Sequence, residues 1–200
     1  MNSVRYFVAV FVLVSLPPGF LLWFAIHPMA RFWRKLGAGW TYAILGLPVV
    51  GMMVGVFALR ARLVGTDLGT NLPLIVLGAI CAAFGITIAL RRRKYLTAAI
   101  LSGIPELSRS GDKGKLLTEG IYSRIRHPRY VEALLWVLGY AFFTNYLGMY
   151  ILFALSVPTI YFIVMLEERE LRDRFGSAYD EYSARVPRFF PRRGTATPPE

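Results

Sequence analysis

The stretch YVEALLWVLGYAFFTNYLGMYILFALSVPTIYFIVML, residues 130–166, contains two apolar runs separated only by Asn145-Tyr146-Leu147. The first run covers residues 130–144 and the second covers residues 148–166. A connection of three residues makes two helices antiparallel neighbours. The start of the first helix and the end of the second therefore lie at the same membrane face, and the sequences at these two ends can share one site.

Three further apolar runs precede this hairpin, at residues 6–26, 40–59 and 72–90. A helix that spans a bilayer needs about 20 mostly apolar residues. Hydrophobic residues make up 56% of the 200-residue chain, above the roughly 45–50% of soluble domains. We therefore predict an all-α integral membrane protein with about five transmembrane helices. Pro17-Pro18 predicts a kink or a break in the first of them.

Lysine and arginine are distributed unevenly between the loops. If the apolar runs cross the membrane in turn, one membrane face receives only Arg5, Arg60 and Arg62. The other twenty basic residues lie at the opposite face. By the positive-inside rule, this predicts a multi-pass cell-membrane protein with its N-terminus outside and with residues 91–129 and the tail at the cytoplasmic face. Because the formal charge of +11 lies between apolar runs, we expect membrane lipids and no nucleic acid as partners.

The segment that enters the hairpin reads GIYSRIRHPRY, residues 120–130. Pro128 favours an extended His127 and can occupy the first turn of the following helix. The free N–H groups and positive dipole end of that helix suit an anionic or dipolar ligand group. Alternatively, the arginines of this segment anchor to lipid headgroups. Both interpretations stay open on the residues alone.

The segment that leaves the hairpin reads LEERELRDRFG, residues 166–176. Glu168 and Glu170 each have an arginine four residues later, which predicts solvated helix pairs. Glu167 has Leu171 at that position. An unpaired carboxylate beside the bilayer needs a cation from a ligand or another helix. Glu167 is therefore the sharper candidate for ligand binding.

Apolar residues recur at helical spacing along the charged tail, which predicts a cytoplasmic amphipathic helix lying on the membrane. They are Leu171, Phe175, Ala178, Tyr179, Tyr182 and Val186. We interpret Tyr179 and Tyr182 as interfacial aromatics. With only two histidines and one cysteine in the chain, we predict no metal site.

Several short motifs occur in a fixed order across the two ends of the hairpin. They are G-x-Y at 120–122, R-H-P-x-Y at 126–130, E-E at 167–168, F-G-x-x-Y-x-x-Y at 175–182 and V-P-R at 186–188. This ordered set resembles the isoprenylcysteine carboxyl methyltransferase family and its bacterial members, which are also similar to phospholipid N-methyltransferases. The resemblance covers about residues 114–191.

The resemblance implies a membrane-embedded methyltransferase that depends on S-adenosyl-L-methionine. The implied acceptor is a lipophilic small molecule or lipid, either an isoprenoid or prenylcysteine-like carboxylate or thiol, or a lipid amine. Residues 1–90 then form three N-terminal transmembrane helices, and residues 91–200 form the cofactor-binding cytoplasmic loop, the hairpin and the tail of one membrane domain. By position, the cofactor contacts would be Lys115, Leu116, Leu117, Tyr122, His127, Pro128, Arg129, Tyr130 and Glu167.

Two positions depart from the family pattern. Ile163 stands where the isoprenylcysteine enzymes have a substrate-contacting arginine, and Glu132 stands where they commonly have glycine. Glu132 and Arg126 are the candidate catalytic residues. The Glu132 carboxylate could contact a cationic or protonated substrate, or pair with Arg126 or Arg129.

Two other functions stay open. Sterol-reductase-type proteins share the R-H-P-x-Y element and use NADPH, although asparagine usually fills the position that Arg129 holds here. A non-catalytic membrane scaffold with a lipid-binding basic rim is the third interpretation. The methyl acceptor and the oligomeric state do not follow from the sequence.

Overall fold

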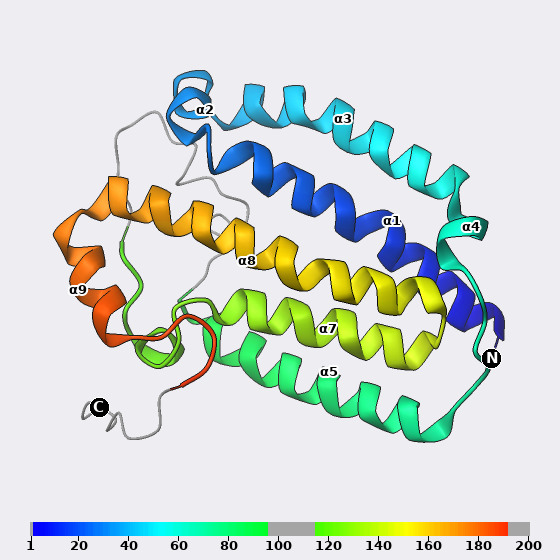
Figure 1. Ribbon diagram of the computed structural model, residues 1–200. Helices are drawn as coiled ribbons and strands as arrows, with labels where there is room; N and C mark the ends of the chain where they lie inside the picture. The colour runs from blue at the N-terminus through cyan, green and yellow to red at the C-terminus, as the bar shows by residue number, and fades with distance from the viewer. Residues whose placement is uncertain (1, 96–114, 192–200) are drawn as a thin grey trace.

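The computed structural model describes residues 2–95 and 115–191, and within these ranges it consists of helices joined by short loops (Figure 1). Residues 96–114 of the predicted cytoplasmic loop and the end of the tail lie outside them. Within the described ranges, four helices are long and apolar enough to cross a membrane. They are α1 (Asn2–Ile26), α3 (Ala38–Ala58), α5 (Leu72–Arg92) and α8 (Leu147–Phe175). The prediction of an all-α membrane protein is confirmed.

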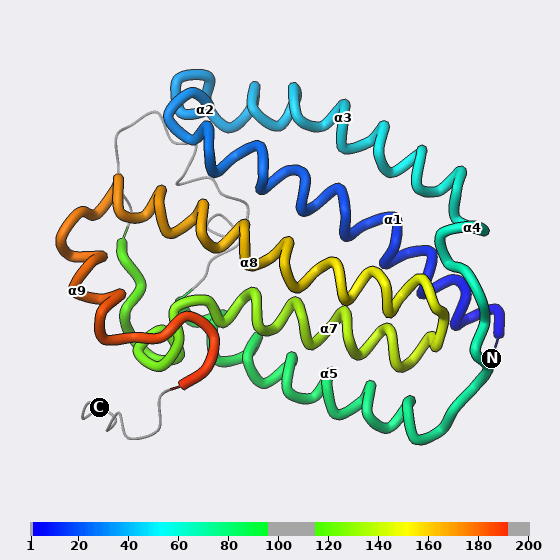
Figure 2. The backbone as a smooth tube through the Cα atoms, in the orientation of Figure 1, coloured from blue at the N-terminus to red at the C-terminus, as the bar shows by residue number. Residues whose placement is uncertain are grey.

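The long helices lie side by side in the order α3, α1, α8, α7, α5 (Figures 1 and 2). Helix α7 (Pro128–Thr144) has 17 residues and is shorter than the four spanning candidates. It packs against α5, α8 and α1, which makes it the central helix of the bundle. Short helices α2 (Ala30–Leu36) and α4 (Arg60–Val64) flank α3 at its two ends.

The predicted hairpin is present between α7 and α8. Asn145 ends α7 in the left-handed conformation, with φ of 50°, which asparagine tolerates better than most residues. Its side-chain amide donates a hydrogen bond to the Gly69 carbonyl at 2.9 Å, and its amide oxygen accepts one from the Tyr150 hydroxyl at 2.8 Å. The chain reverses within two residues, and α8 begins at Leu147. The start of α7 and the end of α8 therefore lie at the same end of the bundle.

Helix α1 continues through Pro17 and Pro18, so the predicted alternative of a broken helix is wrong. Each proline removes one backbone donor, but membrane helices tolerate this because local adjustments and neighbouring groups satisfy the freed carbonyls.

The predicted amphipathic tail helix is divided in two. Helix α8 continues to Phe175, Gly176 breaks it with φ of 58°, and α9 (Ser177–Arg185) folds back (Figure 1). The apolar side of α9 is buried against the protein, in a cluster that contains Tyr179, Tyr182 and Val186. The expectation that this apolar face lies on the membrane is therefore wrong, because the reversal at Gly176 turns it towards the bundle.

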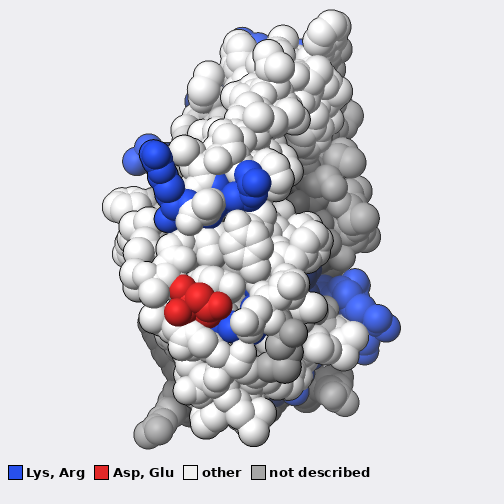
Figure 3. Space-filling model, turned by 90° about the vertical axis from the view of Figure 1, so that its right-hand side faces the viewer, with Lys and Arg blue, Asp and Glu red and all other residues white. Residues whose placement is uncertain are grey.

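The opposite end of the bundle is fixed by a buried cation. Arg5 is 1% exposed. Its guanidinium contacts the Asp67 carboxylate at 2.5 Å and donates to the Thr144 carbonyl at 2.8 Å. The Gly69 backbone N–H and the Arg5 guanidinium together lower the pKa of Asp67. The surface at this end is mostly uncharged, with few basic and acidic side chains (Figure 3).

Gly148 gives a test of the contact between α8 and α4. A Cβ at this position would collide with the backbone carbonyl oxygens of Leu63 and Val64. We expect Gly148→Ala to lower the free energy of unfolding by about 1–3 kcal/mol, as overpacking does. Gly51→Ala is the matched control, because a Cβ at that helical glycine meets nothing within 4 Å. Thermal unfolding in detergent measures both, and equal midpoints would contradict the packing described here.

Candidate active site

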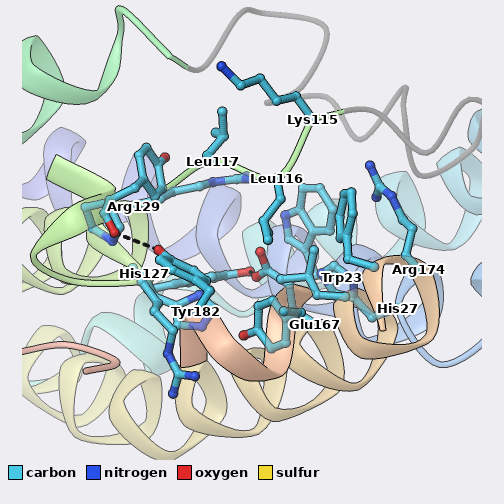
Figure 4. Close-up of a pocket in the computed structure, with 17 residues that line it drawn as sticks. Trp23, His27, Lys115, Leu116, Leu117, His127, Arg129, Glu167, Arg174 and Tyr182 are labelled. Atoms are coloured by element: carbon cyan, nitrogen blue, oxygen red, sulfur yellow. Dashed lines mark hydrogen bonds between the residues drawn. The ribbon is translucent and has the colours of Figure 1, made fainter. Parts of the chain in front are cut away.

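All nine residues predicted to contact the cofactor line one pocket (Figure 4). They are Lys115, Leu116, Leu117, Tyr122, His127, Pro128, Arg129, Tyr130 and Glu167. The pocket lies where the start of α7, the end of α8 and α9 meet. Its volume of about 150 Å³ exceeds the roughly 10–15 Å³ that one water needs. It is therefore a site for a molecule rather than for a single water, and cofactor contact by these residues remains a prediction.

The loop that enters α7 is held by the tail of the chain. The backbone N–H of Arg126 donates to the Pro187 carbonyl at 2.9 Å, and that of His127 donates to the Arg188 carbonyl at 3.0 Å. Pro128 occupies the first turn of α7, as predicted. The tail therefore sets the position from which the helix N-terminus faces the pocket.

Glu168 is the centre of a buried ionic cluster. Its side chain is 1% exposed and contacts the Arg126 guanidinium at 3.0 Å and the His127 imidazole at 3.1 Å. Arg188 donates to both carboxylate oxygens, at 3.0 and 2.9 Å. The predicted partner Arg172 is 3.8 Å away. The predicted pair is therefore present, but the expectation that it is solvated is wrong, because three cationic or polar groups from other segments enclose the carboxylate.

Glu170 is also buried rather than solvated. Its carboxylate contacts the Arg34 guanidinium of α2 at 2.6 Å and the predicted partner Arg174 at 3.4 Å. Nearby, Arg31 of α2 contacts Asp173 of α8 at 2.9 Å, in an exposed pair. Two ion pairs thus tie α2 to the end of α8.

Glu167 lines the pocket (Figure 4). Its carboxylate accepts a hydrogen bond of 2.6 Å from the Tyr130 hydroxyl. The partner that another helix supplies to Glu167 is therefore the phenol of Tyr130 and not a cation. The carboxylate can still accept a hydrogen bond from a cationic group in the pocket.

The two candidate catalytic residues lie in different places. Arg126 lines the pocket and contacts Glu168. Glu132 is buried, does not line the pocket, and accepts two hydrogen bonds from the Arg92 guanidinium of α5. The expected pairing of Glu132 with Arg126 or Arg129 is wrong, because the close packing of α5 on α7 brings Arg92 to the carboxylate instead.

Trp23 and His27, which the sequence motifs do not indicate, line the pocket from the end of α1. Their rings stack with a centroid distance of 5.1 Å, and the Arg129 guanidinium lies 4.8 Å from the Trp23 ring centroid. Burial lowers the pKa of His27. The only sequence signal was an aromatic residue four positions before a histidine at the end of an apolar run.

Tyr179 and Tyr182 also line the pocket, and both are buried. The Tyr182 hydroxyl donates to the Tyr122 carbonyl at 2.7 Å (Figure 4). Their interpretation as interfacial aromatics is therefore wrong. The pocket thus combines aromatic and aliphatic walls with one carboxylate and several basic groups, which suits a ligand that carries both charges and a ring. Among the residues that the structure describes, no group of three His, Cys, Asp or Glu side chains could hold a metal ion.

A family model described as phospholipid methyltransferase matches residues 73–178. The chain is 39% identical over 94 residues to the cobalt-zinc-cadmium resistance protein CzcN of Cupriavidus metallidurans, covering 44% of this chain and 43% of that protein. It is 34% identical over 77 residues to the protein-S-isoprenylcysteine O-methyltransferase of Schizosaccharomyces pombe, covering 38% and 33%. It is 32% identical over 118 residues to protein-S-isoprenylcysteine O-methyltransferase B of Arabidopsis thaliana, covering 58% and 55%.

The matches span about half the length of these relatives or less. The matched family segment begins in α5 and ends in α9, so it contains the hairpin and most of the pocket. It does not include Trp23 or His27. The resemblance stated from the sequence motifs is confirmed.

The Glu168 cluster leads to a prediction on stability. Glu168→Gln removes the charge that compensates the Arg126 and Arg188 guanidiniums. We expect the free energy of unfolding to fall by about 3–5 kcal/mol, the usual cost of breaking a buried ion pair from one side. Chemical unfolding in detergent, followed by tryptophan fluorescence, measures the loss.

Asp173→Asn on the same helix is the control. It removes the same charge from an exposed pair with Arg31, which contributes less than about 1 kcal/mol. A Glu168→Gln variant as stable as the control variant would contradict a structural role for the cluster.

Proposed function

We propose a function from the premise that this chain belongs to the phospholipid methyltransferase family, whose model matches just over half of its length. The chain is a membrane-embedded methyltransferase. It takes the methyl group from S-adenosylmethionine and transfers it to a lipophilic acceptor.

The observation that carries this proposal is the gathering of nine predicted cofactor contacts in one pocket. S-adenosylmethionine has a sulfonium, an ammonium, a carboxylate and an adenine ring. The Glu167 carboxylate suits the cationic groups, whereas Arg129 and the N-terminus of α7 suit the carboxylate. Leu116, Leu117 and the surrounding aromatic rings would hold the adenine. When bound, the cofactor supplies an activated methyl group, and the contribution of this chain is to orient it towards the acceptor.

The lipophilic nature of the acceptor is supported by where the pocket lies. Its walls come from α1, α7 and α8, which also form the apolar bundle. Two of the relatives are named for O-methylation of isoprenylcysteine, and the family is named for phospholipids. A lipid or prenylated molecule can reach such a site from the side, within the membrane.

The cytoplasmic location of the pocket rests on charge. The pocket end carries the basic residues of α2, of the loop entering α7 and of the tail. The opposite end has few charged side chains (Figure 3). The positive-inside rule then places the pocket at the cytoplasmic face and the N-terminus outside.

Cofactor binding tests the assignment of Glu167. In detergent, calorimetry is expected to detect S-adenosylmethionine and S-adenosylhomocysteine but not NADPH, the cofactor of the alternative reductase function. Glu167→Gln is expected to lower the binding affinity for S-adenosylmethionine by about 10- to 100-fold, because a hydrogen bond to a charged group contributes about 1.5–3 kcal/mol. Asp173→Asn, which removes an exposed carboxylate from the same helix, serves again as the control and should bind normally. If Glu167→Gln and Asp173→Asn bind S-adenosylmethionine with equal affinity, Glu167 does not contact the cofactor.

Transfer of a labelled methyl group tests the reaction itself. Membranes that contain the chain are supplied with methyl-labelled S-adenosylmethionine, and the lipid extract is separated. We expect a labelled lipid that forms more slowly when the chain carries Glu167→Gln. Binding of NADPH without binding of S-adenosylmethionine would instead support the reductase.

A further inference from the structure

His27 is a buried basic group in the pocket that no part of the proposed cofactor site uses. It is 6% exposed and lines the pocket. Neither of its ring nitrogens has a hydrogen-bond partner among the described residues. Buried polar atoms in proteins are almost always paired, so an unpaired imidazole facing a cavity indicates a partner that the cavity holds.

The imidazole is held firmly. It stacks on Trp23 with an interplanar angle of 21°. The turn that carries it is closed by a hydrogen bond of 2.8 Å from the Trp33 indole N–H to the Ala25 carbonyl. The Arg34–Glu170 pair then fastens α2 to α8. These contacts fix the position of His27 in the wall of the pocket.

The charges around His27 come from every neighbouring element. Glu167 of α8 favours the protonated imidazole, whereas Arg129 of α7 and His127 of the preceding loop disfavour it. Lys115 and Arg174 line the same pocket. Burial has the largest effect and lowers the pKa of His27 below its ordinary value of 6.5. At neutral pH the ring is uncharged and has one nitrogen that can accept a proton.

We infer that His27 accepts the proton of the methyl acceptor, which is an amine, thiol or hydroxyl on a lipophilic molecule rather than a carboxylate. The inference rests on the proposed methyl-transfer function. A carboxylate acceptor has no proton to release, so it leaves the accepting nitrogen of His27 without a donor. An N–H, S–H or O–H group instead donates to that nitrogen.

The reaction balances with this assignment. The heteroatom of the acceptor forms a bond to the methyl carbon while the bond between that carbon and sulfur breaks. The sulfonium becomes a neutral thioether as it takes the bonding pair. The proton of the acceptor moves to the His27 imidazole, which becomes imidazolium and later releases it to water.

Other groups in the pocket are less suited to this role. The ring of His127 contacts Glu168 at 3.1 Å. Burial raises the pKa of the Tyr122, Tyr179 and Tyr182 phenols, so they stay protonated. Glu167 already accepts a hydrogen bond from a tyrosine. Among the described pocket residues, His27 is the group best placed to take a proton.

Turnover of three acceptors of equal chain length tests the inference. They are dodecylamine, dodecanethiol and dodecanoate, each given with S-adenosylmethionine. Wild-type chain is expected to methylate the amine or the thiol and not the carboxylate. His27→Phe keeps the stacking on Trp23 and is expected to lower kcat by about 100-fold or more, the usual contribution of a general base. Its affinity for S-adenosylhomocysteine should be unchanged.

The pH profile separates a proton acceptor from a structural residue. Because the pKa of His27 is lowered, wild-type kcat should hold at neutral pH and fall as the pH drops below 6.5. His27→Phe should lack this fall. Phe24→Leu, one turn earlier in α1 and outside the pocket, is the control and should keep the wild-type profile.

Nuclear magnetic resonance gives a readout that does not depend on turnover. The chain has two histidines, so protein labelled at the imidazole Cε1 gives two ring signals, and His27→Phe identifies them. With S-adenosylhomocysteine bound, dodecylamine or dodecanethiol is expected to shift the His27 signal, and dodecanoate is not.

The outcomes distinguish the two proposals. If wild-type chain neither binds S-adenosylhomocysteine nor transfers a methyl group, the proposed function fails. If wild-type chain transfers the methyl group and His27→Phe is equally fast, or only dodecanoate is methylated, the role of His27 fails alone. Loss of S-adenosylhomocysteine binding in His27→Phe would overturn it too, by assigning His27 to the cofactor.

Discussion

The buried carboxylate of Glu168 is the constraint on which the pocket depends. A charge that is 1% exposed is costly unless it is fully paired. Its partners come from two segments distant in sequence, Arg126 and His127 before α7 and Arg188 in the tail. Satisfying this one group therefore brings the tail over the entering loop, and the pocket is the space that this closure leaves.

Arg5 performs the corresponding task at the other end of the bundle, with a buried cation in place of a buried anion. Between the two ends, the helices pack through apolar and small residues, including the close approach of Gly78 to Gly139. Lipid is as apolar as leucine, so the hydrophobic effect gives helices in a membrane little preference for one register. The buried ion pairs at the two ends of the bundle favour one helix register, because the charged groups are paired only in that register.

The sequence predicted those parts of the site that follow from local rules. The tight bend at Asn145 and the Pro128 helix start placed the two ends of the hairpin together, and the family resemblance assigned nine pocket residues. The errors concern the solvation of Glu168 and Glu170, the partner of Glu132 and the interfacial placement of Tyr179 and Tyr182. The i,i+4 partners of Glu168 and Glu170 are present. Burial and the further partners are set by the packing of α2, α5 and the tail on the hairpin, which no local rule contains. His27 was missed for the same reason.

Two separate parts of the chain form the pocket. If the proposed function holds, this division affects which methyl acceptors the protein accepts. The cofactor side is made by the hairpin and the tail, and most of it lies within the residues that match the family. The side with Trp23 and His27 is made by α1, outside that match. At this end of the bundle it is fastened through the Arg31 and Arg34 pairs to α8, through the Arg129 guanidinium over the Trp23 ring and through apolar packing. Substitutions in α1 and α2 can therefore change what approaches the methyl group while the Glu168 cluster, and with it the cofactor side, stays intact.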